Sequence, residues 1–581
     1  MPEITGIKLP DYLVIITYFA VIIFAGYYFS RYIRLAKDYF AAGSIMPWWL
    51  AGTSYFMASF STLLFVIYNE IAYVYGLVAV TICWIGSFCL FIGGSLLAHR
   101  WRRARVLTPV AYMERRFNKS VHQIFVWTGF PLRLFDNGLK ILSTAIVITV
   151  AINHPAITFN RFVIIIGLIM IAYTYMGGQL AVIITDFVQA IIIAVAISML
   201  FFLTFSRLDS IHNFIAGVPA GFFLPIRRPY NWSYLLFTSF AIGIFAVNAG
   251  WAMVQKYNCV RSESDARKMV YYITFLKFIT PPIFFFPGMA ARYLIPGIED
   301  TRQAYAVIGL TILPVGLMGF LLAAMFSATM STLGSEYNTL SGVLTRDFYK
   351  KKINPDASEK REILFGRVST LIIGLVTMMI AIVLYQIRAL NLMDIMYRIF
   401  SAFGPPIMIP LVAGLLIKKI NSRGVTWGVL GGIAVGLSTQ TANMILVQKY
   451  AGLMAVNEQV DFWLRSGWNS AATMMNITTV ILGMWLGSIT KETPPDEKTR
   501  MLKFFTDMKQ PYLLDPKEKP PFSPFGIMGK ILAVLGFAMV GISILVFFVY
   551  NDMRAFGLNL ITGLLLIVIS IVMRIKSSKY A

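Results

Sequence analysis

The chain has 581 residues, of which 58% are hydrophobic and only 13% are charged, with a mean hydropathy of +0.71. Because soluble domains contain about 25% charged residues, this composition excludes an ordinary soluble protein. The formal net charge of +23 would suit a nucleic-acid-binding protein. However, the Lys and Arg residues gather in short clusters between apolar segments, which excludes a single basic face for nucleic acid.

The apolar segments are long enough to cross a membrane, since about 20 apolar residues span the hydrocarbon core of a bilayer. We therefore predict an all-α multispanning protein embedded in a lipid bilayer, with about 15 transmembrane helices. We number these predicted helices one to fifteen. They lie at residues 12–31, 48–71, 75–98, 122–152, 160–176, 183–206, 233–256, 267–291, 305–346, 366–387, 393–417, 425–447, 468–490, 529–550 and 555–574.

The basic clusters predict the orientation of the chain in the membrane. Segments such as "HRWRRAR", "KYNCVRSESDARK", "RDFYKKK", "KKINSRG" and "MRIKSSK" follow alternate predicted helices. Lys and Arg are enriched in cytoplasmic loops of membrane proteins. The pattern predicts a multi-pass protein of the inner or plasma membrane, with its N-terminus outside and its C-terminus in the cytoplasm.

The sequence does not favour an enzyme. Cys83, Cys89 and Cys259 form no paired or metal-spaced motif. The four His residues are scattered, and no nucleophile motif or organic cofactor signature is present. The longest polar segment, 491–528, is rich in Pro and Lys and is predicted to be a cytoplasmic linker.

Predicted helix two is interrupted by small and polar residues at mid-span, in "WWLAGTSYFMASFSTLLFV". A broken helix leaves backbone carbonyls free, which a membrane protein tolerates only where they line a cavity or bind an ion. A continuous serine-rich helix would have the same sequence pattern, so both interpretations stay open.

Predicted helix four carries Arg133, Asp136 and Lys140 at spacings that place them near one stripe. One interpretation is a neutralising network inside the protein. The other starts from the excess of one positive charge, because a charge kept at membrane depth needs a partner. That excess predicts an anionic ligand.

Two further ionisable residues lie singly in predicted spans. Asp186 is near the start of helix six, where it is either an interfacial residue close to water or part of a functional site. Lys277 lies within helix eight, in "ITFLKFITPP", and has no partner nearby in the sequence.

Predicted helix nine is crowded with hydroxyl groups in "MFSATMSTLGSEYNTLSG". Residues four apart share a face of a helix, so the Thr332 hydroxyl lies beside the Ala328 carbonyl, with Ser331 on its flank. Three oxygens within one turn suit a small hard cation. The alternative is close helix packing, in which Ser and Thr bond back to their own helix.

Several segments resemble the sodium/solute symporter family, in the order in which that family has them. They are "KDYFAAGSIMPWWLAGTSYF", "YTYMGGQLAVIITDFVQ", "VQKYNCVRSESDARK", "FLKFITPPIFFFPGMAA" and "SATMSTLGSEYNTLSGVLTRDFYKK". The similarity covers about residues 10–450. It implies the LeuT-type fold, in which two five-helix repeats of opposite topology hold substrate and ions between them.

The resemblance also implies a domain organisation. Residues 1–47 would form a peripheral helix and a cytoplasmic loop, 48–207 the first repeat with helices two to six, and 208–424 the second repeat with helices seven to eleven. Residues 425–581 would hold peripheral helices twelve to fifteen.

The same resemblance implies a sodium site, with Na⁺ as the coupling ion. Its ligands would be the carbonyls of Met57, Phe60 and Ala328 and the hydroxyls of Ser331 and Thr332. Asp186 matches an acidic residue that supports this ion or binds a second one in some members. Ser335 matches one hydroxyl of that second site, but Gly334 replaces the other, which puts a second sodium ion in doubt.

The solute is less well defined by the resemblance. Ser59, Leu64 and Cys83 fall at positions where sugar carriers have polar side chains, and the latter two are too apolar for a polyol. Lys140 lies one residue from the position that holds a carboxylate in sialic-acid carriers. Lys277 matches a lysine that is also present in sugar carriers, so it does not distinguish one class of solute from another. Arg133 and Asp136 are the remaining candidate solute residues.

These observations predict a sodium-coupled symporter that imports a small solute by alternating access. The excess positive charge on helix four favours a carboxylate-bearing solute. The alternatives are a sodium-coupled sugar or polyol symporter and a transporter-like membrane receptor. Nothing in the sequence requires an oligomer.

Overall fold

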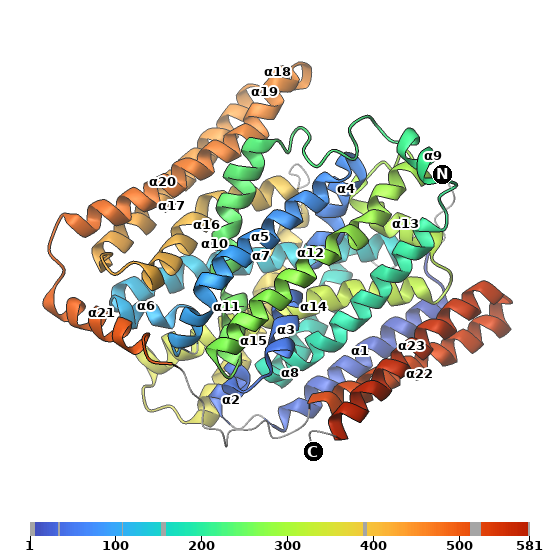
Figure 1. Ribbon diagram of the computed structural model, residues 1–581, viewed down its shortest axis with the longest axis horizontal. Helices are drawn as coiled ribbons and strands as arrows, with labels where there is room; N and C mark the ends of the chain where they lie inside the picture. The colour runs from blue at the N-terminus through green and yellow to red at the C-terminus, as the bar shows by residue number, and fades with distance from the viewer. Residues whose placement is uncertain are drawn as a thin grey trace.

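The computed structural model describes residues 6–32, 35–106, 108–152, 158–386, 392–511 and 524–578. Long helices lie side by side and are tilted against one another (Figure 1). The helices of the first third are α1 (Leu9–Ser30), α2 (Ala36–Ala41), α3 (Trp48–Ala58), α4 (Asn69–Tyr75), α5 (Val78–Arg103), α6 (Ala111–Arg116), α7 (Lys119–Ile152) and α8 (Phe159–Phe205).

The middle of the chain forms α9 (Ile211–Gly217), α10 (Ala241–Ala249), α11 (Trp251–Cys259), α12 (Glu263–Leu294), α13 (Ala304–Ile312), α14 (Leu317–Val343), α15 (Glu359–Gln386) and α16 (Leu392–Leu416). The last part forms α17 (Ser422–Lys449), α18 (Ala451–Val456), α19 (Glu458–Phe462), α20 (Trp468–Ile489), α21 (Pro495–Asp507), α22 (Pro524–Tyr550) and α23 (Met553–Ser578). The π-helical segments η2 (Leu64–Tyr68) and η3 (Tyr234–Phe240) lead into α4 and α10.

Each of the fifteen predicted segments overlaps a helix. Within the described ranges, 12 helices are long and apolar enough to cross a membrane, and the bent pair α10–α11 makes a thirteenth span. The two remaining segments, 48–71 and 160–176, correspond to shorter apolar helices. The prediction of an all-α multispanning membrane protein is therefore confirmed.

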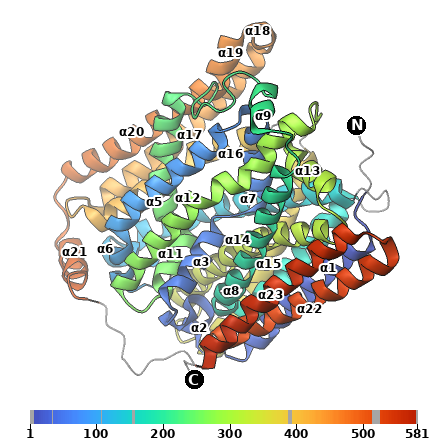
Figure 2. The same cartoon turned by 45° about the vertical axis from the view of Figure 1, so that its right-hand side comes forward.

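Helix α14 forms the centre of the molecule. Every residue from Leu317 to Val343 is buried, and α14 packs against α1, α3, α7, α8, α11 and α15. Figure 2 shows it behind α3 and α8. A span that meets no lipid does not need an apolar outer face, which explains why this helix tolerates so many hydroxyl groups.

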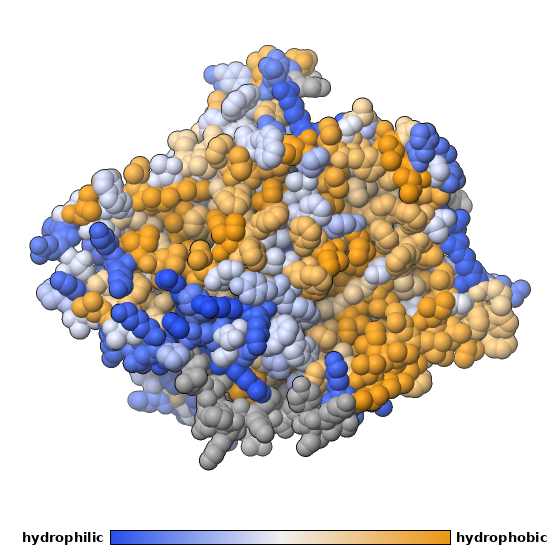
Figure 3. All heavy atoms as spheres, viewed as in Figure 1, coloured by the Kyte–Doolittle hydropathy of each residue, from blue (hydrophilic) through white to orange (hydrophobic). Residues whose placement is uncertain are grey.

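Two helix pairs lie at opposite sides of this core (Figures 1 and 2). Helices α22 and α23 pack on each other, and α22 also packs on α1, whereas α17 and α20 pack together against α16. The surface over α22 and α23 is largely hydrophobic, and hydrophilic residues gather at the end of the molecule that carries α6 and α21 (Figure 3). The bounds of the predicted repeats stay a prediction.

Two spans are interrupted in mid-membrane. Helix α3 ends at Ala58, and the chain continues without helical structure through Ser59–Ser61 before η2 and α4. Of the two interpretations of predicted helix two, the broken helix is therefore the one present. A second break lies at Gly250, where α10 and α11 meet at a bend of 43°. The first helix of each predicted repeat is thus broken.

The prediction of a linker at 491–528 is wrong for its first part, because residues Pro495–Asp507 form α21. This helix docks on the polar end of the core, where Arg500 donates to the Phe117 carbonyl at 2.9 Å and Glu497 accepts from the Ser422 amide at 2.6 Å. A proline in the first turn with acidic residues after it starts a helix rather than preventing one. Residues 512–523 lie outside the described part of the chain.

Helix α8 contains a kink at Gly178 that separates its two halves. Gly178 has φ +51° and ψ −158°, a backbone conformation that residues with a Cβ rarely adopt. A Cβ there would come within 2.6 Å of the Tyr39 ring and 2.8 Å of the Tyr39 carbonyl. The glycine therefore allows the close approach of α2 and sets the direction of the half that carries Asp186.

We expect Gly178→Ala to lower the thermal stability of the purified protein, because strain and the clash with Tyr39 together cost about 1 to 3 kcal/mol or more. Gly541→Ala is the matched control, because a Cβ there meets nothing within 4 Å. Alanine is the better helix former, so this control should keep or raise the stability. Equal melting temperatures for the two variants would show that Gly178 is not needed for the kink.

Candidate functional site

The break in α3 faces the centre of α14. The Thr332 hydroxyl lies 3.3 Å from the Met57 carbonyl, 3.3 Å from the Phe60 carbonyl and 2.9 Å from the Ala328 carbonyl. One hydroxyl has a single proton to donate, so these three acceptors outnumber the donors available from Thr332. Thr332, Met57, Phe60 and Ala328 are all buried. Such a cluster of oxygens is electron-rich and suits a cation.

Most other hydroxyl groups of α14 have an ordinary structural role. Thr329 bonds with Thr62 of the break and lies 2.8 Å from the Thr144 hydroxyl of α7. Ser327 and Ser341 bond back to carbonyls of their own helix, and Thr339 donates to Gln255. The packing interpretation of the hydroxyl-rich sequence is therefore right for these residues.

Ser331 differs from its neighbours. Its hydroxyl is buried and makes no hydrogen bond of ordinary geometry with a described residue, although it lies near the Asp186 carboxylate of α8. A buried polar group without a partner is unusual in a folded protein, and an ion is one of the explanations. Ser331 is adjacent to Thr332 in the sequence, so this oxygen belongs to the turn that carries the oxygen cluster. The structure thus brings four of the five predicted sodium ligands into contact and places the fifth, Ser331, on the same turn of α14.

A second polar cluster lies one helical turn along α14. Asp186 of α8 is fully buried, so the interfacial interpretation of this residue is wrong. Its carboxylate accepts a hydrogen bond from Ser54 of α3 and lies 4.0 Å from the ammonium of Lys256 on α11. The same ammonium donates to the Ser335 hydroxyl at 2.9 Å. Asp186 and Ser335 are thus neighbours, as the resemblance implied.

Lys256 was missed by the sequence analysis, which grouped it with the cytoplasmic basic residues. The structure buries it completely. The available signal was Gly250, where the helix breaks at membrane depth. Counted from that break, Lys256 lies within the first two turns of α11 rather than at the surface.

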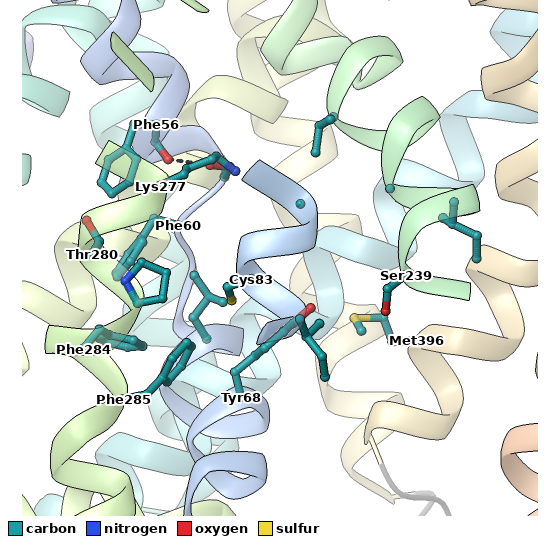
Figure 4. A pocket seen from close by; sticks show the side chains of 18 of the residues that line it. Phe56, Phe60, Tyr68, Cys83, Ser239, Lys277, Thr280, Phe284, Phe285 and Met396 are labelled. Carbon is teal, nitrogen blue, oxygen red and sulfur yellow. Dashed lines mark hydrogen bonds between the residues drawn. The ribbon is translucent and has the colours of Figure 1, made fainter. Parts of the chain in front are cut away.

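A cavity of about 310 Å³ lies on the other side of the break. It is lined by residues of α3, the break, η2, α5, η3, α10, α12 and α16, including four of the predicted solute residues: Ser59, Leu64, Cys83 and Lys277. Figure 4 shows the rings of Phe60, Phe284 and Phe285 on one side and Ser239 and Met396 across from them. Its volume is that of a small-molecule site.

The lining of the cavity is apolar and aromatic. Among the described residues it contains no Asp, Glu, Asn or Gln side chain, and its polar groups are hydroxyls, one thiol and the Lys277 ammonium. That ammonium forms no ion pair with a described residue, whereas the Lys277 carbonyl accepts from Ser87 at 3.0 Å. The cavity therefore offers one positive charge on an apolar surface.

Phe60 belongs to both sites. Its carbonyl faces Thr332, and its ring lines the cavity, 5.6 Å from the Phe56 ring and 5.1 Å from the Phe284 ring between centroids. Because carbonyl and ring are attached to one Cα, a shift of the break moves both. This residue therefore connects the oxygen cluster around Thr332 directly to the cavity.

The charged stripe of α7 lies elsewhere. Arg133 is paired with Glu336 of α14 at 3.0 Å, although 203 residues separate them, and Lys140 is paired with Asp136 at 2.7 Å. The predicted excess of one positive charge is therefore wrong, because Glu336 neutralises Arg133. None of Arg133, Asp136 and Lys140 lines the cavity. The network interpretation holds, and the inference of an anionic solute from this stripe loses its basis.

Comparison with known proteins identifies a family and several relatives of this chain. The model of the sodium:solute symporter family matches residues 39–220 and 250–432. The chain is 26% identical over 469 residues to a sodium/glucose cotransporter of Vibrio parahaemolyticus, covering 74% of this chain and 85% of that protein. It is 25% identical over 451 residues to a sodium/sialic acid symporter of Aliivibrio fischeri, covering 74% and 88% respectively.

The fold is similar to that of a solved Na⁺-coupled sialic acid symporter. The two structures agree with a TM-score of 0.67 over 82% of this chain and 98% of the other, at 21% sequence identity. The predicted LeuT-type class is thereby confirmed.

The ion pair between α7 and α14 generates a stability prediction. Arg133→Gln leaves the Glu336 carboxylate buried without its cation, which should destabilise the protein by about 3 to 5 kcal/mol. Arg133→Gln/Glu336→Gln removes both charges and should recover much of that loss. Thermal unfolding of the purified variants measures the difference. A double variant that is less stable than the single one would contradict the pairing.

Proposed function

The chain belongs to the sodium:solute symporter family, and we propose that its coupling ion binds between the break in α3 and the middle of α14. The protein is a sodium-coupled solute symporter of a membrane, not an enzyme. In this proposal the ligands are the carbonyls of Met57, Phe60 and Ala328 together with the hydroxyls of Ser331 and Thr332.

The observation that carries this assignment is the Ser331 hydroxyl, which is buried near the Asp186 carboxylate and makes no hydrogen bond of ordinary geometry with a described residue. It lies next to a hydroxyl that faces three carbonyl oxygens. Alkali and alkaline-earth cations prefer oxygen ligands of this kind. An ion at this position would give Ser331 a partner and compensate the surplus of acceptors at the break.

The solute proposed for the cavity is a small organic anion with an apolar body and one carboxylate. Lys277 offers the charge, and the rings of Phe60, Phe284 and Phe285 offer an apolar surface. A sugar or polyol is the alternative, since relatives carry glucose by name. We favour the carboxylate because a polyol brings many hydroxyl groups, and each one left without a partner in an apolar cavity costs about 1 to 3 kcal/mol.

Coupling follows from the shared break. Sodium at the proposed site would hold the carbonyl of Phe60, and so fix the position of the Phe60 ring that the solute contacts. An ion shifts a conformational equilibrium only through its different affinity for the two states. We propose that sodium favours the state in which the break is ordered and the cavity accepts solute, and that alternating access then releases both inside.

We propose that the protein lies in the inner or plasma membrane, with α6 and α21 on the cytoplasmic side. The basic clusters and the hydrophilic end of the molecule support it (Figure 3). Ion cluster and cavity both lie within one chain, so we propose that transport needs no second copy.

A transporter-like receptor would bind sodium and solute without moving either across the membrane. Uptake of a labelled solute into proteoliposomes, with and without an inward sodium gradient, separates transport from reception. Sodium-driven accumulation above the external concentration establishes the symporter. If the internal concentration of solute only reaches the external one, transport is not coupled to the sodium gradient.

Sodium should raise the melting temperature of the purified protein, and Ser331→Ala/Thr332→Ala should weaken this effect. Loss of an oxygen ligand to a charge costs about 1 to 3 kcal/mol, so the sodium concentration for half-maximal stabilisation should rise at least tenfold. Potassium serves as the comparison ion. Ser341→Ala is the matched control, because that hydroxyl bonds back to Asn338 on the same helix and should leave the response unchanged.

An unaltered sodium response in the double variant would reject the site while leaving family membership intact. A reduced response in Ser341→Ala as well would point to a general destabilisation of α14.

Lys277→Gln should raise the half-saturation concentration for a transported carboxylate by tenfold or more, since a hydrogen bond to a charged group contributes about 1.5 to 3 kcal/mol. Sodium-dependent stabilisation should persist, because Lys277 is not a proposed ion ligand. The panel contains labelled branched and aromatic monocarboxylates, glucose and myo-inositol. Lys268→Gln, an exposed lysine of the same helix, is the matched control.

Transport of glucose or myo-inositol, with no monocarboxylate accepted, would reject the carboxylate proposal. The sodium-coupled symporter would be unaffected by that outcome.

A further inference from the structure

Lys256 is a fully buried lysine in the last turn of the short helix α11. It lies on α11, six residues after the break at Gly250. Its ammonium faces two other helices, because it donates to Ser335 of α14 at 2.9 Å and lies 4.0 Å from the Asp186 carboxylate of α8. Asp186 in turn accepts a hydrogen bond from Ser54 of α3.

This cluster adjoins the proposed sodium site. Ser331 and Ser335 are four residues apart on α14 and so share one face of the helix. The ion at Ser331 and the ammonium at Ser335 would therefore be neighbouring cations. Asp186 is the acidic side chain paired with Lys256. It also lies near the Ser331 hydroxyl, and its Oδ1 makes no hydrogen bond of ordinary geometry with a described residue.

We propose that the Lys256 ammonium is a resident cation that takes the place of a second sodium ion beside Asp186, and that it limits this protein to one sodium ion per chain. The proposal rests on the sodium site proposed for Ser331 and Thr332. In it, Lys256 is a residue that determines ion stoichiometry, not a ligand of the coupling ion.

Charge balance supports this role. Asp186 has one negative charge, and a buried carboxylate needs one cation. The ammonium already supplies it. The other acid that interacts with Lys256 is Glu336, and it is already paired with Arg133 at 3.0 Å. A second sodium ion would therefore add an uncompensated positive charge next to both the ammonium and the first ion. Lys256 thus excludes a second sodium ion in two ways: its charge repels the ion, and its ammonium already donates a hydrogen bond to the Ser335 hydroxyl.

The same groups become cation ligands when the ammonium is removed. The Asp186 carboxylate and the hydroxyls of Ser54 and Ser335 offer oxygens, which a small hard cation prefers. A lysine-to-glutamine change removes the charge and keeps a long polar side chain. The buried carboxylate then needs a new cation, and sodium is the abundant one.

The experiment counts sodium ions bound to the purified full-length protein, using equilibrium binding of ²²Na⁺. We expect one ion per chain in the natural sequence, with a Hill coefficient near one. Lys256→Gln should bind two, with a Hill coefficient above one. Lys256→Gln/Asp186→Asn should return to one ion, because the carboxylate charge is gone as well.

Lys256→Arg is the matched control, because it keeps the positive charge and should bind one ion. A purely structural role for Lys256, in which it only ties α11 to α8, predicts one ion in every folded variant. That result would overturn the proposal. Two ions in the natural sequence or in Lys256→Arg would overturn it as well, and both measurements are independent of whether Lys256→Gln folds.

Failure of the proposed sodium site gives a different result. No bound sodium in the natural sequence, at concentrations that saturate relatives, would reject the assignment of Ser331 and Thr332, and the stoichiometry proposal would fail with it. One ion that persists in Ser331→Ala/Thr332→Ala would reject that assignment alone.

Discussion

The contact between the interrupted α3 and the hydroxyl face of α14 is the interaction on which the rest of the structure depends. A helix broken in a membrane leaves carbonyl oxygens that no water can satisfy. Thr332 faces the carbonyls of Met57 and Phe60 at 3.3 Å each, and the break can persist because these oxygens have α14 beside them. The cavity exists for the same reason, since a continuous helix would not open space beside Ser59 and Leu64.

Hydropathy was enough to predict the spans, and residue spacing was enough to place Ser331 and Thr332 beside the Ala328 carbonyl. The break in α3 was one of two open interpretations, and only the family resemblance implied the carbonyls of Met57 and Phe60. Lipid imposes length and apolarity on each span, and the spacing from Ala328 to Thr332 is local. The partners of Arg133 and Lys256 could not be predicted in this way. Glu336 lies 203 residues from Arg133, and the location of Lys256 depends on the break at Gly250. Helix α21 was missed because its first prolines also suit a linker.

Burial of charge divides the basic residues of the core into two kinds. Arg133, Lys140 and Lys256 each have an acidic partner within 4.0 Å, so their charges are balanced inside the protein. Lys277 forms no ion pair with a described residue and lines the cavity. Balanced pairs connect helices to one another, whereas an unbalanced cation beside an apolar surface is free to select a solute by charge.

The complete enclosure of α14 separates the ion cluster from the bilayer. Helices such as α22 and α23 carry exposed apolar residues, including Phe537 and Ile561, and would adjust their tilt when bilayer thickness changes. Every residue of α14 is instead surrounded by protein. Hydrophobic mismatch therefore reaches the ion cluster only through the packing of intervening helices. Membranes of different thickness would change how fast the outer helices move against the core far more than they would change the geometry of the oxygen cluster around Thr332.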